Sequence, residues 1–357
     1  MGAGENGGFK ERAPIVRIVV GLASLLDLPQ LADDLLRVES ALRRSVETTD
    51  PFLTEVAGHL IAAGGKRLRP ALALAVAYAS APEAASREAP QAAVLGGVSV
   101  ELVHLGSLYH DDVMDEALTR RGVESVNARW GNLVAILAGD FLLARASEIA
   151  ATLGTEVAGL LAATIADLCE GQVRELTKIF DVARTEEAYL QAIEGKTAAL
   201  MSASCRIGAL TAGLPRTAVD ALTVYGNRLG MVFQIVDDVL DVVCTDEELG
   251  KPAGNDLVTG VYTLPVIRAM AGAPELQGLL GHPLDNDAMH EARRVVCSDG
   301  AIGAALGLAE EYAGQAERAL DGLDATPGVE ALRRLPRALV EGVPLSGLSG
   351  ASGVSRR

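Results

Sequence analysis

The stretch LVHLGSLYHDDVMDEAL, residues 102–118, repeats apolar side chains three and four positions apart. That spacing aligns them along one side of a helix and predicts a buried α-helix rather than a strand. LVAILAGDFLLARASEIAATL at 133–153 and LGMVFQIVDDVLDVV at 229–243 follow the same period. Alternating apolar and polar residues, which indicate strands, are few. The pattern therefore predicts an all-α fold with ten or more helices.

Composition and length favour one large domain. The chain has 357 residues, of which 49% are hydrophobic and only 3% aromatic, a balance typical of helical proteins. No interior stretch is long and polar enough to be a linker between domains. We therefore expect a disordered tail over residues 1–12, a single domain over 13–344, and a flexible Gly/Ser-rich tail over 345–357.

Charge and cysteine content reduce the number of functional classes to which the protein can belong. Because the formal net charge is -16, nucleic acid is not expected as a partner, and an anionic substrate would need a local cation or metal. The cysteines at 169, 205, 244 and 297 have no metal-ligand spacing and are expected to be reduced, buried thiols. The apolar stretch 15–29 is too short to span a bilayer and precedes no cleavage site, so we expect an amphipathic helix in a cytoplasmic protein.

Three carboxylates interrupt the first of these apolar helices. Asp111 and Asp115 are four residues apart and share one face, whereas Asp112 is rotated by about 100°. Crowded and partly buried acids repel one another and lose solvation unless a cation balances them. Taken alone, the cluster has two interpretations: a cation site, or a solvated helix end whose acids pair with Arg120 and Arg121.

A second copy of the pattern favours the cation site. Asp237, Asp238 and Asp241 repeat the DDxxD spacing inside another apolar helix, with Gln234 on the same face. Two helices that each project carboxylates can hold divalent ions between them. Oxygen ligands without a His or Cys cluster are typical of Mg²⁺, which completes its shell with water and phosphate oxygens. The sequence therefore predicts a magnesium site for a phosphate ester or diphosphate.

Basic residues agree with a phosphate-containing substrate. In GGKRLRP, two glycines precede Lys66, Arg67 and Arg69, which combines backbone N–H groups with cations suited to phosphate. EGKTAAL, by contrast, is not a nucleotide-binding P-loop, because Leu190 stands where that motif requires glycine.

Together these motifs resemble the trans-type isoprenyl (polyprenyl) diphosphate synthases over residues 50–270. In chain order they are GGKRLRP (64–70), VELVHLGSLYHDDVMDEALTRRG (100–122), LAGDFLLARA (137–146), GKTAAL (195–200), FQIVDDVLDVV (233–243) and GKPAGNDLVTGVYTLP (250–265). The resemblance implies the isoprenoid synthase fold, a single large helical bundle around a central cavity. It also implies sequential head-to-tail 1'-4 condensation of isopentenyl diphosphate with an allylic diphosphate. Mg²⁺, as two or three ions per active site, would assist ionisation of the allylic diphosphate.

The resemblance further implies a role for individual residues. The implied metal ligands are Asp111, Asp112, Asp115, Asp237, Asp238 and Asp241; all of these except Asp241, together with Lys196, are the expected catalytic residues. Isopentenyl diphosphate is expected to bind Lys66, Arg69, His104 and Arg121. The allylic diphosphate is expected to bind Arg120, Lys196, Thr197, Gln234 and Lys251.

One position departs from the family pattern. Family members usually carry lysine in the motif G-K-x-T-L-P, whereas this chain has Val261 there. Loss of one charge-assisted hydrogen bond costs on the order of 1.5–3 kcal/mol if nothing replaces it. Weaker binding, a different preferred substrate and reliance on a partner subunit are therefore all open, although the metal ligands and both arginines are present.

Product length is predicted from the residues that precede the first acid cluster. Gly106 and Ser107 lie about one turn before Asp111, where the growing hydrocarbon would descend, and short-chain members carry a bulky aromatic in this region. Small residues predict an open tunnel and an all-trans product of roughly six to ten isoprene units. Alternatively, they only permit close helix packing, and the enzyme makes geranylgeranyl or farnesyl diphosphate.

Other classes of function give different expectations. A terpene cyclase also ionises diphosphates but generally lacks GGKRLRP and the paired arginines. A non-catalytic subunit of a heteromeric synthase would bind substrate without turnover, and a structural helical protein would expose both acid clusters to solvent.

The family resemblance implies a homodimer. A long polyprenyl product would partition into a bilayer, which predicts transient membrane contact during product release.

Overall fold

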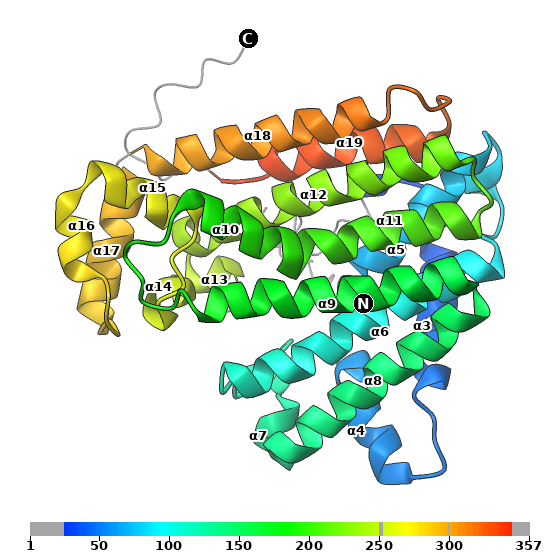
Figure 1. Ribbon diagram of the computed structural model, residues 1–357, viewed down its shortest axis with the longest axis horizontal. Coiled ribbons are helices and arrows are strands. Elements are labelled where there is room, and N and C mark those ends of the chain that lie inside the picture. The colour runs from blue at the N-terminus through cyan, green and yellow to red at the C-terminus, as the bar shows by residue number, and fades with distance from the viewer. Residues whose placement is uncertain (1–24, 250–252, 299, 345–357) are drawn as a thin grey trace, which may run out of the picture.

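The computed structural model describes residues 25–249, 253–298 and 300–344, and these are mostly α-helical (Figure 1). From the first described helix to the long α9 the helices are α3 (Leu31–Ser45), α4 (Pro51–Ala62), α5 (Leu68–Ala77), α6 (Gln91–Met114), α7 (Val126–Trp130), α8 (Asn132–Thr152) and α9 (Thr155–Leu176). Short 3₁₀ turns follow α5 at Tyr78–Ser80 and Ala84–Ser86. Residues 15–24 of the predicted first helix, and both predicted tails, lie outside the described residues.

The second half of the chain continues the bundle. Its elements are α10 (Glu186–Ile193), the π-helix η3 (Glu194–Ala198), α11 (Ala199–Thr211), α12 (Arg216–Val243), α13 (Asp246–Leu249), α14 (Asn255–Thr259), α15 (Leu264–Gly272), α16 (Pro274–Leu279), α17 (Asn286–Ser298), α18 (Ala301–Ala319) and α19 (Pro327–Glu341). The prediction of an all-α fold with ten or more helices is confirmed.

A two-stranded hairpin is the one sheet among the described residues. Strands β1 (Thr119–Arg120) and β2 (Val123–Glu124) pair antiparallel, with Arg120 opposite Val123. The two turn residues, Arg121 and Gly122, have φ of 55° and 77°. Positive φ at both central residues is the geometry of a tight type I′ turn, which matches the twist of the strands it joins. The hairpin directly follows α6 and turns two adjacent arginines back toward the bundle.

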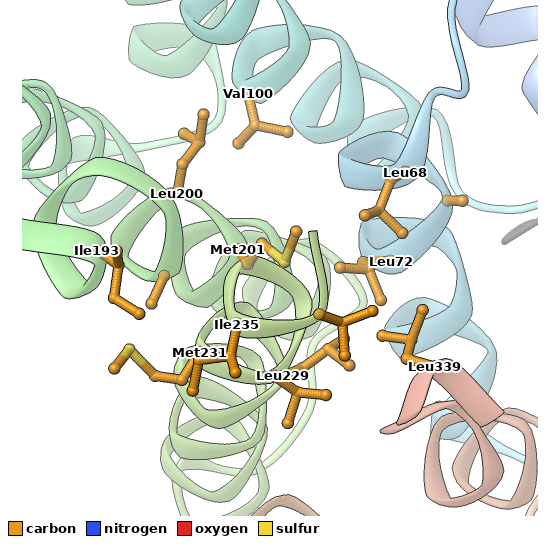
Figure 2. Packing of buried hydrophobic residues seen from close by; sticks show 14 of the residues in the cluster. Leu68, Leu72, Val100, Ile193, Leu200, Met201, Leu229, Met231, Ile235 and Leu339 are labelled. Atoms are coloured by element: carbon orange, nitrogen blue, oxygen red, sulfur yellow. The ribbon is translucent and has the colours of Figure 1, made fainter. Parts of the chain in front are cut away.

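Helices α6 and α12 form the centre of the bundle. Helix α6 packs against α8 and α5, and α12 packs against α11 and α18 (Figure 1). Both are apolar around much of their circumference, as expected for helices surrounded by others. Figure 2 shows side chains of α5, α11, α12 and α19, among them Leu72, Met201, Leu229 and Leu339, gathered in one hydrophobic cluster. Two distant helices that carry acid clusters are thereby fixed in one core.

Local signals set several helix starts. Asp50 caps α4 by accepting hydrogen bonds from the backbone of Phe52 and Leu53, and Pro51 begins the helix. Thr185 and Thr326 cap α10 and α19 in a similar way, each through one backbone N–H. A side-chain oxygen at the N-cap satisfies backbone donors that have no partner within the helix.

Helix α6 is the one described helix that is long and apolar enough to cross a membrane by length and composition. However, 72% of its most apolar window is buried by the rest of the protein, so packing inside the bundle accounts for its apolar character.

All four cysteines are free, and two of them, Cys205 and Cys244, are buried as expected. Cys169 differs from the prediction because it is exposed on α9, and Cys297 is only half-buried. Cysteine is usually buried, but the position of Cys169 on the side of α9 away from the core outweighs that preference.

Candidate active site

One cavity of about 930 Å³ collects most of the predicted site residues. It lies among α6, the β1–β2 hairpin, α9, η3, α12, α13 and the residues that lead into α5. Its walls include Lys66, Arg69, His104, Ser107, Asp111, Arg120, Arg121, Lys196, Thr197, Gln234 and Asp237. A second cavity of about 700 Å³ between α18 and α19 holds none of them.

In the first acid cluster, one carboxylate faces the cavity. Asp111 lines the wall, whereas Asp112 is fully buried; its Oδ1 accepts a hydrogen bond from Nε of Arg120 at 2.6 Å and forms an ion pair with Nη2 of the same side chain at 2.6 Å. Asp115 caps the end of α6 and is exposed. Burial raises the pKa of Asp111 to about 6, although Lys196 opposes that rise. The cluster therefore lacks enough positive charge from the protein alone.

The second cluster has the same division. Asp237 lines the cavity, but Asp238 turns inward and accepts hydrogen bonds from Tyr189 at 2.6 Å and Gln234 at 2.7 Å. The Oδ2 atom of Asp241 accepts a hydrogen bond from the backbone N–H of Asp256. Asp111 and Asp237 thus line the cavity, whereas Asp112 and Asp238 are bound by protein donors; that all six aspartates bind metal stays a prediction. Successive residues point about 100° apart on a helix, so the second acid of each motif leaves the cavity face.

The carboxylates that face the cavity fit Mg²⁺. No three His, Cys, Asp or Glu side chains among the described residues form a closed metal cage. Mg²⁺ does not require one, since it commonly binds one or two carboxylates and keeps water and phosphate oxygens for the rest of its shell. Asp112 adds a buried Oδ2 atom with no hydrogen-bond partner in the described part of the chain.

A basic region forms one wall of the cavity. Arg121 donates to the carbonyls of Leu60 and Gly64, and a Cβ on Gly65 would lie 2.7 Å from its Nη1 atom. A side chain at position 65 would displace the Arg121 guanidinium, and the φ of 155° also favours glycine there. The buried Nε of Arg69 has no hydrogen-bond partner among the residues described, and burial lowers the pKa of Arg69 to about 10. Such a cation can be completed by an anionic ligand.

His104 lies in the same wall and is neutral. Burial, together with the nearby Arg69 and Arg121 guanidinium groups, lowers the pKa of His104 well below its usual value. A neutral imidazole can still donate one hydrogen bond to a phosphate oxygen. The region thus combines fixed arginine charges with a neutral donor.

Arg67 departs from its neighbours in GGKRLRP. Its guanidinium is buried, with Nε and Nη1 paired to Glu39 and to Glu101, the latter at 3.0 Å. Arg67 borders the cavity, but two acids already pair with its charge, and these pairs anchor the loop before α5. Its part in binding phosphate stays a prediction. The φ of 45° at Arg67 turns the side chain inward.

Lys196 and Thr197 are positioned by the π-helix η3. π-Helical turns are rare and occur often at functional sites. Lys196 pairs with Glu175 of α9, a residue that the sequence motifs did not identify. Burial lowers the pKa of Lys196, but Glu175 and Asp111 outweigh that effect and raise it overall. The side chain is therefore a stable cation beside Glu175 and the first acid cluster.

The two residues predicted to control product length have different surroundings. Ser107 lines the cavity, and its hydroxyl donates to the carbonyl of His104 at 2.9 Å. Gly106 is buried against α8, where an added Cβ would lie 3.0 Å from the carbonyl of Gly139. For Gly106 the alternative of close helix packing holds, because residues one apart face different directions.

The cavity has an apolar part that no sequence motif indicated. Leu108 of α6, Leu168 of α9, and Phe233 and Leu240 of α12 line it, together with the exposed Cys169. The helix packing shows that apolar side chains at these positions border a cavity.

Lys251 and Val261 belong to the last motif, GKPAGNDLVTGVYTLP. Lys251 lies outside the described residues. Val261 is described and does not line the cavity; its backbone N–H donates to the carbonyl of Asp256 at 2.9 Å.

Comparison with known proteins gives consistent matches along most of the chain. The polyprenyl synthetase family model matches residues 50–296. Nonaprenyl diphosphate synthase of Mycobacterium tuberculosis is 39% identical over 305 residues, or 84% of this chain and 89% of that protein. Heptaprenyl diphosphate synthase component 2 of Geobacillus stearothermophilus is 38% identical over 82% of this chain and 91% of its own length. A polyprenyl synthase from Caulobacter crescentus, solved with calcium and isoprenyl diphosphate, has a TM-score of 0.80 at 32% identity and covers 93% of this chain and 99% of that one.

Proposed function

The chain belongs to the polyprenyl synthetase family, and on that premise we propose that it condenses isopentenyl diphosphate with an allylic diphosphate to make an all-trans polyprenyl diphosphate. The observation that carries the proposal is the composition of a single cavity. Asp111 and Asp237 line it together with the basic Arg69, Arg121 and Lys196, beside an apolar wall.

The allylic diphosphate is proposed to bind where the two acid clusters meet. Arg120, Lys196, Thr197 and Gln234 border this part of the cavity, and the family motif assigns Lys251 to the same ligand. Mg²⁺, as two or three ions held by Asp111 and Asp237, would neutralise charge on the departing diphosphate. Lys196 and Arg120 add fixed positive charge on the same side.

The second diphosphate is proposed to bind the basic wall. Arg69, with its unpaired buried Nε, Arg121 and Lys66 supply charge, and neutral His104 supplies a donor. This site keeps isopentenyl diphosphate beside the allylic substrate, so that two reactants are held in one orientation.

The reaction then follows from the geometry of two adjacent substrates. The C–O bond of the allylic diphosphate breaks, and diphosphate leaves with the electron pair. The double bond of isopentenyl diphosphate forms the new C–C bond to the allylic carbon, and a proton passes to an oxygen of the departed diphosphate, which regenerates an alkene. Leu108, Phe233 and Leu240 provide dry walls that protect the carbocation from water.

A long product, of six to ten isoprene units, agrees with this cavity and with the relatives. The curated relatives described above are a nonaprenyl and a heptaprenyl synthase. Ser107 leaves space where a bulky side chain would block the hydrocarbon. The relative named as component 2 of its synthase raises a second candidate, a chain that needs a further subunit for activity.

One assay separates these candidates. The purified chain, with Mg²⁺, isopentenyl diphosphate and each of several allylic primers, is expected to give long products on chromatography of the dephosphorylated material. EDTA, or the substitution Asp111→Asn or Asp237→Asn, should abolish turnover, whereas Asp220→Asn, an exposed acid of α12, should not. No product from the chain alone would favour the subunit, and turnover in EDTA would refute the mechanism.

We also propose a homodimer formed through α8. Leu133, Ile136 and Leu137 on this helix are 71%, 42% and 57% exposed, which is unusual for neighbouring large apolar side chains.

Met114, Val173 and Leu176 are exposed at the edge of the cavity and would favour transient membrane contact when a hydrophobic product leaves.

A further inference from the structure

A chain of hydrogen bonds runs from the wall of the cavity to Tyr189, a buried residue of α10. The hydroxyl of Thr197 donates to Oε1 of Gln234 at 2.7 Å, and Nε2 of Gln234 donates to Oδ1 of Asp238 at 2.7 Å. The hydroxyl of Tyr189 donates to Oδ2 of the same carboxylate at 2.6 Å. Thr197 and Gln234 line the cavity, whereas Tyr189 and Asp238 are 1% and 3% exposed and do not.

The donors and acceptors along this chain have one consistent direction. Gln234 turns its N–H₂ group toward Asp238 and its carbonyl oxygen toward Thr197, which matches the donors and acceptors of both neighbours. The second N–H of that amide then stays available for an anionic ligand in the cavity. Without Asp238, the amide could rotate and present its carbonyl oxygen to that ligand instead.

Tyr189 is itself held in place from behind. The guanidinium of Arg184 lies 5.6 Å from the centre of its ring and also donates to the carbonyl of Tyr262 at 3.0 Å. Burial and the charge of Asp238 raise the pKa of Tyr189 well above its usual value, so the phenol keeps its proton and remains a donor. Each oxygen of Asp238 therefore has a protein donor, while its neighbour Asp237 faces the cavity.

We propose that Tyr189 is a positioning residue, which holds Asp238 so that Gln234 and Thr197 are oriented toward the allylic diphosphate. Asp238 serves this orientation and is not a metal ligand. The inference rests on the proposed function, because it assigns that diphosphate to the Gln234 side of the cavity. Neither the family motifs nor the DDxxD pattern indicates Tyr189.

Tyr189→Phe tests the proposal because it removes the hydroxyl and keeps the ring. We expect the KM for the allylic primer to rise about tenfold, with the KM for isopentenyl diphosphate unchanged. Binding of inorganic diphosphate in the presence of Mg²⁺, measured by calorimetry, should weaken by a similar factor. Tyr225→Phe is the matched control: its buried hydroxyl donates to the carbonyl of Leu332 at 2.7 Å and it does not line the cavity, so both constants should stay at wild-type values.

The role of Asp238 is tested separately by its Mg²⁺ dependence. Asp238→Asn should reproduce the Tyr189→Phe effect without adding to it in the double variant. It should also leave the Mg²⁺ concentration for half-maximal activity unchanged. Wild-type primer KM and diphosphate affinity in Tyr189→Phe would overturn the inference. So would a shift in Mg²⁺ dependence for Asp238→Asn, which also decides the case if the tyrosine variant does not fold. An inactive wild-type chain would refute the proposed function instead, and calorimetry would still test the positioning role.

Discussion

Around Arg67, residues that are adjacent in sequence have different structural roles. Lys66, Arg67 and Arg69 all border the cavity, but the side chain of Arg67 is only 4% exposed and is paired with Glu39 and Glu101. Arg67 has a left-handed backbone conformation, with φ of 45°, which changes the direction of its side chain. Amino-acid composition does not predict this conformation. A buried arginine with two acids is stable only while all three charges are present.

Arg67→Met is therefore expected to destabilise the fold. It leaves Glu101 buried without its closest cation, and we expect the free energy of unfolding to fall by roughly 3 kcal/mol. Urea denaturation measures this loss. Arg87→Met removes an exposed pair with Glu83 and should change the same quantity by less than about 1 kcal/mol. Equal losses in the two variants would contradict the structural role of Arg67.

Ser107→Phe tests the tail path at a single residue. The ring would fill the cavity about one turn before Asp111, so we expect shorter polyprenyl products on chromatography after dephosphorylation. Ser107→Ala keeps the space open and should leave product length as in wild type. An unchanged product distribution in the phenylalanine variant would exclude Ser107 as part of the path.

At the level of secondary-structure elements, the contact between α9 and η3 positions residues of the candidate active site. Gly171 of α9 and Gly195 of η3 are in contact, and a Cβ on Gly171 would lie 2.4 Å from the backbone nitrogen of Lys196. Only hydrogen atoms fit between the two backbones. The crossing therefore sets the depth at which η3 places Lys196 and Thr197 in the cavity.

Gly171→Ala should separate these helices and shift the two ligand-binding residues. Because displacement of a positioned group by about 1 Å can lower activity on the order of 100-fold, we expect a loss of that size in kcat/KM. Gly307→Ala in α18 is the control, since an added Cβ meets no atom within 4 Å. It should raise the free energy of unfolding by roughly 0.5–1 kcal/mol and leave kcat/KM unchanged. Wild-type kinetics in Gly171→Ala would contradict this account.

For the whole molecule, surface charge and exposed apolar area act in opposite directions. A net charge of -16 opposes association between identical chains, but α8 presents Leu133, Ile136 and Leu137 to solvent. A second copy that covered this face would remove the apolar surface from water.

Leu137→Glu is expected to convert the proposed dimer into a monomer. Burial of a carboxylate at an apolar interface without a partner is unfavourable, so sedimentation velocity should show the smaller species. Leu36 on α3 is 68% exposed, and Leu36→Glu provides a control of equal chemistry away from α8, which should remain dimeric. Identical sedimentation of wild type and Leu137→Glu would reject α8 as the interface.

Much of the site could be predicted because its chemistry is local in sequence. DDxxD spacing within a helix, glycines beside cations and the order of six motifs correctly indicated Asp111, Asp237, Lys66, Arg69 and Lys196 as cavity residues. The inward turn of Arg67, Asp238 and Gly106 was not predictable. Each depends on which neighbouring element supplies a partner, and apolar spacing gives the face of a helix but not the identity of what packs there.

The sequence by itself determined the helical architecture, the family and the presence of two acid clusters, because helix period and motif spacing are properties of consecutive residues. Only the tertiary structure decided which acid of each cluster faces the cavity and which donors hold the others. It also revealed the link from Tyr189 through Asp238 to Gln234. The physical reason is that side-chain direction becomes functional only when distant helices pack, and hydrogen-bond partners then come from elements that are separate in sequence.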